Sequence, residues 1–169
     1  MRRLLDGLYD LAAGLAALCM VGLLVMVLLS IISRQLHFYV PGTDAYAGYL
    51  MAASGFLALA HTLKRGEHIR VTLLLSALKG PAQRALEIWA LLAASALAVL
   101  SAYYSTRLVW QSHTFNDIST SNDATPSWLP QISMAVGTII LAIAFLDELV
   151  LELRGQRRRA PSDEAAHNE

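Results

Sequence analysis

Long hydrophobic runs alternate with short polar segments along the whole chain. The runs over residues 11–33 and 45–63 contain no Asp, Glu, Lys or Arg, and two similar runs follow later in the sequence. A helix needs about 20 apolar residues to cross the hydrocarbon core of a bilayer. The pattern therefore predicts an all-α integral membrane protein with four transmembrane helices. The predicted spans cover about residues 8–33, 45–63, 86–108 and 129–151.

The segment between the second and third predicted spans has a different pattern. It reads KRGEHIRVTLLLSALKG, and its apolar run is too short to cross a bilayer. Polar residues recur in it three or four positions apart: Arg65, His68, Thr72, Ser76 and Lys79. On a helix they form one polar stripe, which predicts a short amphipathic helix over about residues 68–79, lying along the membrane surface.

Two charged residues of this segment fall on its apolar side. Glu67 and Arg70 are three positions apart, so they can form a local ion pair while Arg70 reaches towards lipid headgroups. Alternatively, the pair contacts a partner protein or a neighbouring helix. Both interpretations are open from the sequence.

The distribution of basic residues predicts the orientation. With a cytoplasmic N-terminus, the outer loops contain only Arg34 and Arg107 of the 13 Lys and Arg residues. Basic residues concentrate in cytoplasmic loops, so both termini are predicted to be cytoplasmic. Residues 1–153 then form a single transmembrane domain, and residues 154–169 form a polar cytoplasmic tail.

Small residues lie at helical spacing in two of the predicted spans. The third span has alanines four positions apart: Ala90, Ala94, Ala98 and Ala102. The second span has Gly48, Ala52 and Gly55. Helices in a membrane associate through such close-packing faces. We favour packing within the helix bundle over a partner interface for both sets.

The connection between the third and fourth spans is the longest predicted outer loop. It is rich in Ser, Thr, Asn and Asp, and two prolines bracket Trp128. Its polarity, length and outward placement make it the candidate docking surface for a partner outside the membrane. The residues expected to take part are Asp117, Asp123 and Trp128.

The composition agrees with a membrane protein and narrows the function classes. Hydrophobic residues make up 56% of the chain and charged residues 15%, whereas soluble domains have about 25% charged residues. The net charge is zero, which argues against a nucleic-acid partner. Cys19 is the only cysteine, so neither an intrachain disulfide nor a dithiol redox site is expected.

Catalytic, metal and cofactor sites are not expected. The five histidines do not fall at metal-ligand spacing, and no pair of spans places two of them at similar depth to hold haem. The middle of each span lacks the ionisable groups of a transport path. These observations predict a membrane-embedded accessory or scaffold subunit that is not an enzyme and binds no substrate, metal or cofactor itself.

Three further features lie around the spans. A G-x-H-I-x-V signature follows the second span: Gly66, His68, Ile69 and Val71. Arg34 ends the first span and Asp44 opens the second. The stretch PSWLPQISMAVG leads into the fourth. Together these features resemble the small membrane subunit of TRAP (tripartite ATP-independent periplasmic) transporters, the DctQ-like family, over about residues 8–150. That family often has Glu where this chain has Asp44.

The resemblance implies a small permease subunit in the bacterial inner membrane. In such systems a periplasmic binding protein delivers an organic anion, typically a carboxylate. A large membrane subunit then transports the anion with sodium ions by an elevator movement. The small subunit would be a fixed scaffold, surrounded by lipid, that packs against the large subunit and helps to dock the binding protein. Glu67, His68 and Arg70 would fix the interfacial helix and its contact with the large subunit.

Alternative functions fit the same pattern of spans. The first is a membrane-anchor subunit of a redox complex, associated with haem or quinone. A self-associating structural protein that uses the alanines of the third span is the second, and a complete small transporter is the third.

Overall fold

The computed structural model describes residues 2–38, 40–65, 81–120 and 123–154. These residues form four helices: α1 (Arg2–Gln35), α2 (Thr43–Arg65), α4 (Pro81–Thr114) and α5 (Trp128–Leu153). The prediction of an all-α protein with four long helices is confirmed. The helix predicted for residues 68–79 lies outside the described residues, as do Gly66, Glu67, His68, Ile69, Arg70, Val71 and most of the polar tail.

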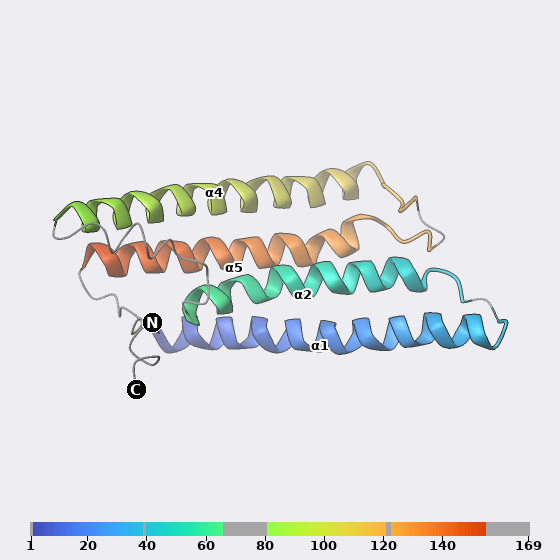
Figure 1. The fold of residues 1–169 in the computed structure, drawn as a ribbon. Coiled ribbons are helices and arrows are strands. Elements are labelled where there is room, and N and C mark those ends of the chain that lie inside the picture. Colours follow the sequence, from blue (N-terminus) through green and yellow to red (C-terminus); the bar gives the residue numbers. More distant parts are fainter. Residues whose placement is uncertain (1, 39, 66–80, 121–122, 155–169) are drawn as a thin grey trace, which may run out of the picture.

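The helices form a single layer in the order α1, α2, α5, α4 (Figure 1). α2 packs against α1 on one side and α5 on the other, and α4 packs against the far side of α5. Two ends of the layer are named here. The loop end carries residues 36–38, 40–42, 115–120 and 123–127, and the terminal end carries the start of α1 and the end of α5 (Figure 1). The central helices α2 and α5 both run from the loop end to the terminal end, so they are parallel.

Three of the helices in the described part of the chain are long and apolar enough to cross a membrane. They are Leu5–Gln35 within α1, Ala82–Thr114 within α4, and Trp128–Leu153, which is α5. The helix α2 is not among them, because its tyrosines, its histidine and its Gly, Ser and Thr residues lower its mean hydropathy. Its 23 residues span roughly 34 Å at about 1.5 Å per residue, which is long enough to cross. Crossing by α2 stays a prediction.

The best-packed region is where α1, α2 and α5 meet near the terminal end. It is formed mostly by small and aliphatic side chains: Tyr9, Ala12, Ala60, Leu63, Ile140 and Ala144. Elsewhere α1 is open, since only 6% of its most hydrophobic 18-residue stretch is buried. An apolar helix with so little cover within the layer requires lipid or another protein around it.

The backbones of α5 and α2 approach each other closely at Gly137 and Phe56. A Cβ atom placed on Gly137 would lie 2.6 Å from both the carbonyl carbon and the carbonyl oxygen of Phe56. Only glycine fits there. By contrast, a Cβ on Gly48 or Gly55 would meet no atom within 4 Å. The expected packing face of α2 is therefore open within the described chain, and α2 packs on α5 through a different face.

The contact between α4 and α5 follows a seven-residue repeat. The buried residues of α5 include Ala135, Ala142 and Leu149, which are seven positions apart and therefore share one face of the helix. The buried residues of α4 are Leu91, Ser95, Ala98, Ser105 and Ser112. A 3.5-residue contact repeat is typical of helices that cross at a small angle.

The predicted alanine set does not follow this repeat, because its members are four positions apart. Ala98 is buried between α4 and α5, Ala94 and Ala102 are half-buried, and Ala90 is exposed. Alanines four apart drift around the helix relative to a 3.5-residue contact repeat.

Candidate interaction surfaces

The most regular exposed apolar surface lies on α5, although this helix is in the middle of the layer. Eight residues spaced alternately three and four apart are each 36% to 55% exposed. We call them the α5 stripe: Leu129, Ile132, Val136, Ile139, Ile143, Leu146, Val150 and Leu153. This alternation is the spacing through which one helix packs along another at a small angle. The α5 stripe thus offers a full-length docking face for a further apolar helix.

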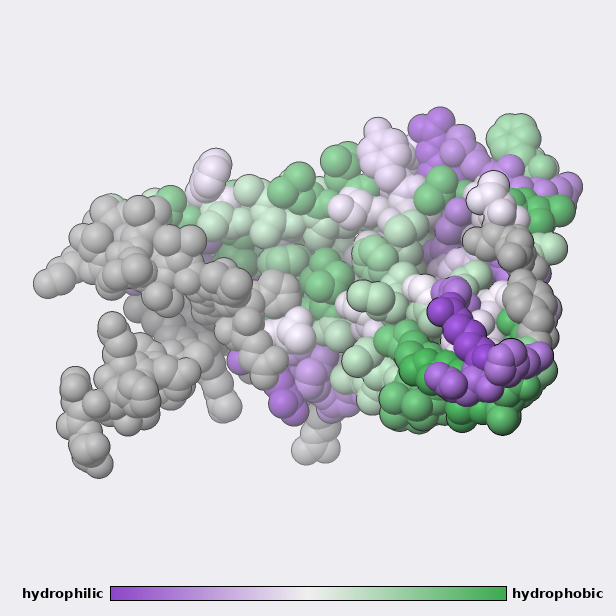
Figure 2. Space-filling model, turned by 45° about the vertical axis from the view of Figure 1, so that its right-hand side comes forward, coloured by the Kyte–Doolittle hydropathy of each residue, from purple (hydrophilic) through white to green (hydrophobic). Residues whose placement is uncertain are grey.

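A second apolar surface covers α1. Large side chains are exposed along most of its length, and hydrophobic residues dominate the lower right of the molecule at the loop end of α1 (Figure 2). Leu24 and Val25, for example, are 58% and 55% exposed. Exposure around the helix, rather than along one stripe, is typical of lipid contact.

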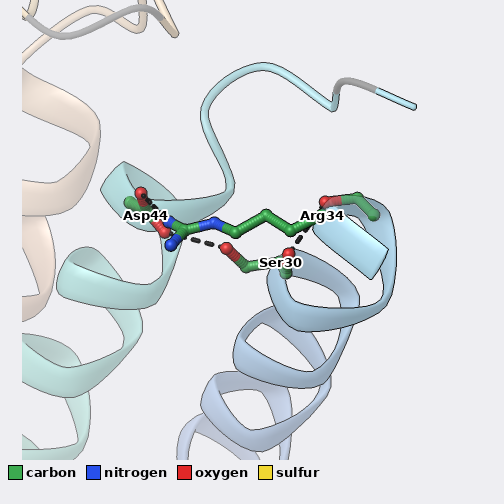
Figure 3. A network of polar contacts seen from close by, with 4 residues as sticks. Ser30, Arg34 and Asp44 are labelled. Carbon is green, nitrogen blue, oxygen red and sulfur yellow. Dashed lines mark hydrogen bonds and ion pairs between the residues drawn. The ribbon is translucent and has the colours of Figure 1, made fainter. Parts of the chain in front are cut away.

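A polar network joins the end of α1 to the start of α2 (Figure 3). The Nη2 atom of Arg34 lies 3.4 Å from Oδ2 of Asp44, and the hydroxyl of Ser30 donates to Oδ1 of Asp44 at 3.1 Å. The structure thus brings together the two charged residues of the predicted motif. Both side chains are more than 70% exposed, and ion pairs this open contribute only about 0–1 kcal/mol in water.

Residues 115–120 and 123–127, on the connection between α4 and α5, pair with each other, and we call them the hairpin. The backbone amide of Ser119 donates to the carbonyl of Thr125 at 2.8 Å, and that of Ser127 donates to the carbonyl of Asp117 at 2.9 Å. Ile118 and Pro126 form an isolated β-bridge. These bonds give the predicted docking loop a defined shape.

Side chains of α2 hold this hairpin against the layer. The hydroxyl of Tyr49 lies 2.9 Å from Oγ of Ser119 and 3.0 Å from Oδ2 of Asp123. One turn away, the hydroxyl of Tyr46 lies 3.1 Å from that of Thr125. We call these five residues the loop clamp: Tyr46, Tyr49, Ser119, Asp123 and Thr125. The clamp fixes the hairpin to α2 across 70 to 79 positions of sequence.

The loop clamp also sets the protonation of Asp123. Hydrogen bonding from the Thr125 side chain lowers the pKa of Asp123 below its ordinary value. Burial opposes this effect to a lesser extent, and hydrogen bonds from Ser119 and Tyr49 lower the pKa further. Asp123 is therefore ionised at neutral pH, and its carboxylate is bonded within the protein.

The three predicted docking residues have different surroundings. Asp117 is exposed, and Asp123 is half-buried in the loop clamp. Trp128 is half-buried and makes an edge-on contact with the ring of His113, with 5.4 Å between ring centroids. Beside them, Phe115 is 73% exposed and Ile118 is 62% exposed. The hairpin surface therefore combines negative charge with exposed apolar side chains.

Most of the chain, including these surfaces, matches a protein-family model. The family model described as "Tripartite ATP-independent periplasmic transporters, DctQ component" matches residues 23–155, which is more than half of the chain. The chain belongs to the DctQ family. No curated protein matches it.

Membership in the DctQ family identifies a small membrane subunit of a TRAP transporter. The family is a transporter component and not an enzyme family. It works in a tripartite system with a large membrane subunit and a binding protein. Within the described part of this DctQ chain, no group of three or more His, Cys, Asp or Glu residues could hold a metal ion.

Contacts at the terminal end were not anticipated from the sequence. Asp6 of α1 lies 2.9 Å from Nζ of Lys64, and Asp10 lies 3.5 Å from Nδ1 of His61. They connect α1 to α2 at the end opposite the Arg34–Asp44 pair. The available signal was the spacing, because the two acids are four apart on one helix and their partners three apart on the other.

Proposed function

We propose that this DctQ subunit is a fixed scaffold for the large subunit of a sodium-coupled TRAP transporter that takes up organic anions, typically carboxylates. The proposed site is the bacterial inner membrane, with α1, α2, α4 and α5 all crossing and both termini in the cytoplasm. The distribution of basic residues along the chain supports this orientation.

The α5 stripe is the observation that carries the scaffold proposal. A central helix of a self-sufficient bundle would be covered on all sides, yet α5 exposes eight aliphatic residues along its whole length. Their alternate spacing of three and four matches helix packing better than random lipid contact. The occupant we propose is a transmembrane helix of the large subunit.

The hairpin at the loop end supports a second role, in docking the binding protein. Asp117 supplies exposed charge, and the loop clamp supplies the fixed geometry that a docking surface needs. Trp128 supports the base of the hairpin through its contact with His113. A basic patch on the binding protein is the complementary surface.

The residues of the signature after α2 keep their proposed role. We propose that residues 68–79 form an interfacial helix, fixed by Glu67, His68 and Arg70, that contacts the large subunit. An Arg70→Ala variant should then lower both recovery of the complex and uptake, and full recovery of both would contradict this role.

The scaffold proposal is tested by pulling down the tagged full-length chain from its native membranes in mild detergent. An Ile139→Trp/Ile143→Trp variant should recover at least tenfold less large subunit, since two indole rings disrupt close helix packing. The matched control is Leu97→Trp on α4, where the side chain is 64% exposed and lies outside the α5 stripe.

Two outcomes of the pull-down contradict the proposal. Equal recovery of the large subunit with the wild type, the double variant and the Leu97→Trp control would show that the α5 stripe faces lipid. A haem band in the visible spectrum, together with redox subunits in the sample, would instead favour the redox-anchor alternative.

A further inference from the structure

A groove between α4 and α5 near the loop end is not used by any surface described above. It has a volume of about 410 Å³. Its lining residues are Tyr104, Ser105, Arg107, Leu108, Gln111 and Met134. None of them is acidic. The groove therefore combines one positive charge with neutral hydrogen-bonding groups and two apolar side chains.

The polar groups of the groove lie on one face of α4. Tyr104, Arg107 and Gln111 are three and four positions apart, so their side chains project in similar directions. Leu108 lies beside them, and Met134 of α5 closes the other wall. Tyr104 is 55% exposed, and Arg107 and Gln111 are also exposed, so these groups are accessible from outside the layer.

Arg107 has no ion-pair partner within the described part of the chain. By contrast, Arg34 at the same end is paired with Asp44. Arg107 lies within Ala82–Thr114, a stretch apolar enough to cross a membrane. A lone guanidinium on such a helix is unfavourable unless an anion or water reaches it.

The depth of Arg107 matches the headgroup region of a bilayer. It precedes His113, which contacts Trp128, by six residues, or roughly 9 Å along the helix axis. Trp110, which is 73% exposed, lies between them. Tryptophan side chains favour the membrane interface. The long Arg107 side chain can therefore reach the level of lipid phosphates while its stem stays beside apolar chains.

We propose that this groove binds the phosphate of a glycerophospholipid from the leaflet at the loop end. The guanidinium of Arg107 donates to the phosphate oxygens, in the paired geometry that arginine and phosphate favour. The amide of Gln111 and the hydroxyl of Tyr104 supply further donors. One acyl chain lies along Leu108 and Met134. The proposal requires α4 to cross the membrane, and it is independent of the partners assigned to the α5 stripe.

Charge complementarity is the argument for a lipid occupant. The groove presents one cation and two neutral hydrogen-bond donors, and its lining includes no carboxylate. It lies at a depth where phosphates are the most abundant anions. The main competing occupant is an acidic side chain of the large subunit, which would bring one fixed carboxylate to the same guanidinium.

The test is native mass spectrometry of the full-length chain, extracted in mild detergent with the subunits that accompany it. Dioleoyl phosphatidylglycerol is titrated into the wild type and into Arg107→Gln, Arg107→Lys and Arg34→Gln variants. Loss of charge-assisted hydrogen bonds should weaken binding roughly tenfold or more in Arg107→Gln. Arg107→Lys should keep part of the affinity, and the Arg34→Gln control should match the wild type.

Two further probes identify the recognised group. Diolein lacks the phosphate and should bind at least tenfold more weakly than the phospholipid. Millimolar inorganic phosphate should not displace either lipid. Unchanged phospholipid binding in Arg107→Gln, or equal binding of diolein, would refute the proposal. Wild-type protein without bound lipid, combined with loss of the large subunit in Arg107→Gln, would assign Arg107 to the protein interface instead. Circular dichroism spectra of all variants should be superimposable, because each replaced side chain is exposed.

Discussion

The contact between Gly137 and Phe56 allows a quantitative prediction about how the layer holds together. Replacing Gly137 with alanine places a methyl group 2.6 Å from two backbone atoms of α2. Neither atom can move as a side chain can, so the two helices must separate. Reaching an ordinary contact of 3.4 Å requires a shift of about 0.8 Å, and a gap of this size forfeits roughly a quarter to a half of each neighbouring dispersion contact.

The expected cost of Gly137→Ala is about 2–3 kcal/mol of stability, at the upper part of the range for overpacked sites. The higher helix propensity of alanine relative to glycine offsets at most about 1 kcal/mol of this strain. A larger side chain, as in Gly137→Leu, should prevent α2 and α5 from packing at all. The layer would then split between its two halves, because α2 and α5 provide most of the contact between them.

The assay is unfolding of the purified full-length chain by sodium dodecyl sulfate in mild detergent, followed by circular dichroism and tryptophan fluorescence. Gly55→Ala on α2 is the matched control, because its new methyl group meets no atom within 4 Å. It should be neutral or stabilising by up to about 1 kcal/mol. If Gly137→Ala is as stable as Gly55→Ala, the result would contradict the close contact between Gly137 of α5 and the backbone of α2.

Three other variants test the polar contacts. Arg34→Ala should cost less than about 1 kcal/mol in the same unfolding assay, since its ion pair with Asp44 is exposed; a larger loss would contradict the exposed geometry of the pair. Tyr49→Phe should speed proteolysis of the hairpin without changing the helix content. An unchanged cleavage rate would show that the loop clamp does not hold the hairpin. The folded-state pKa of Asp123 is lowered. The stabilisation that its ionised carboxylate gives the hairpin is therefore fully present above the ordinary carboxyl pKa, and it is lost as the pH falls through the lowered pKa. Hairpin protection should therefore persist at pH 5 and fall only in stronger acid, while Asp123→Asn should remove this pH dependence; protection lost near neutral pH would contradict the assignment.

The helices could be predicted from the sequence because each hydrophobic run carries its own signal. The order of the helices in the layer could not, because it depends on which small residues meet. Gly137 is a single glycine in an ordinary apolar run, and the sequence alone does not identify Phe56 as its neighbour. Conversely, the alanines from Ala90 to Ala102 form a clear pattern, yet the contact of α4 with α5 follows a seven-residue repeat.

The candidate site residues divide in the same way. Arg34 and Asp44 could be paired from sequence, since only a short connection separates the helices that carry them. The contact of Tyr49 with Asp123 joins residues 74 positions apart, and no local pattern indicates it. The sequence marked Asp123 as a docking residue for its charge, whereas the structure bonds that carboxylate within the protein.

The parallel direction of α2 and α5 has an electrostatic consequence. Neighbouring antiparallel helices largely cancel each other's peptide dipoles, but the dipoles of two parallel helices add. Each contributes roughly half a positive charge at its N-terminus, and both N-termini lie at the loop end. Asp44 in the first turn of α2 and Asp123 beside it supply negative charge where these dipoles converge. The C-termini of α1 and α4 bring the opposite partial charge to the two outer edges of the loop end. A charged surface that approaches this end therefore meets a positive middle, partly neutralised by these two carboxylates, between two negative edges.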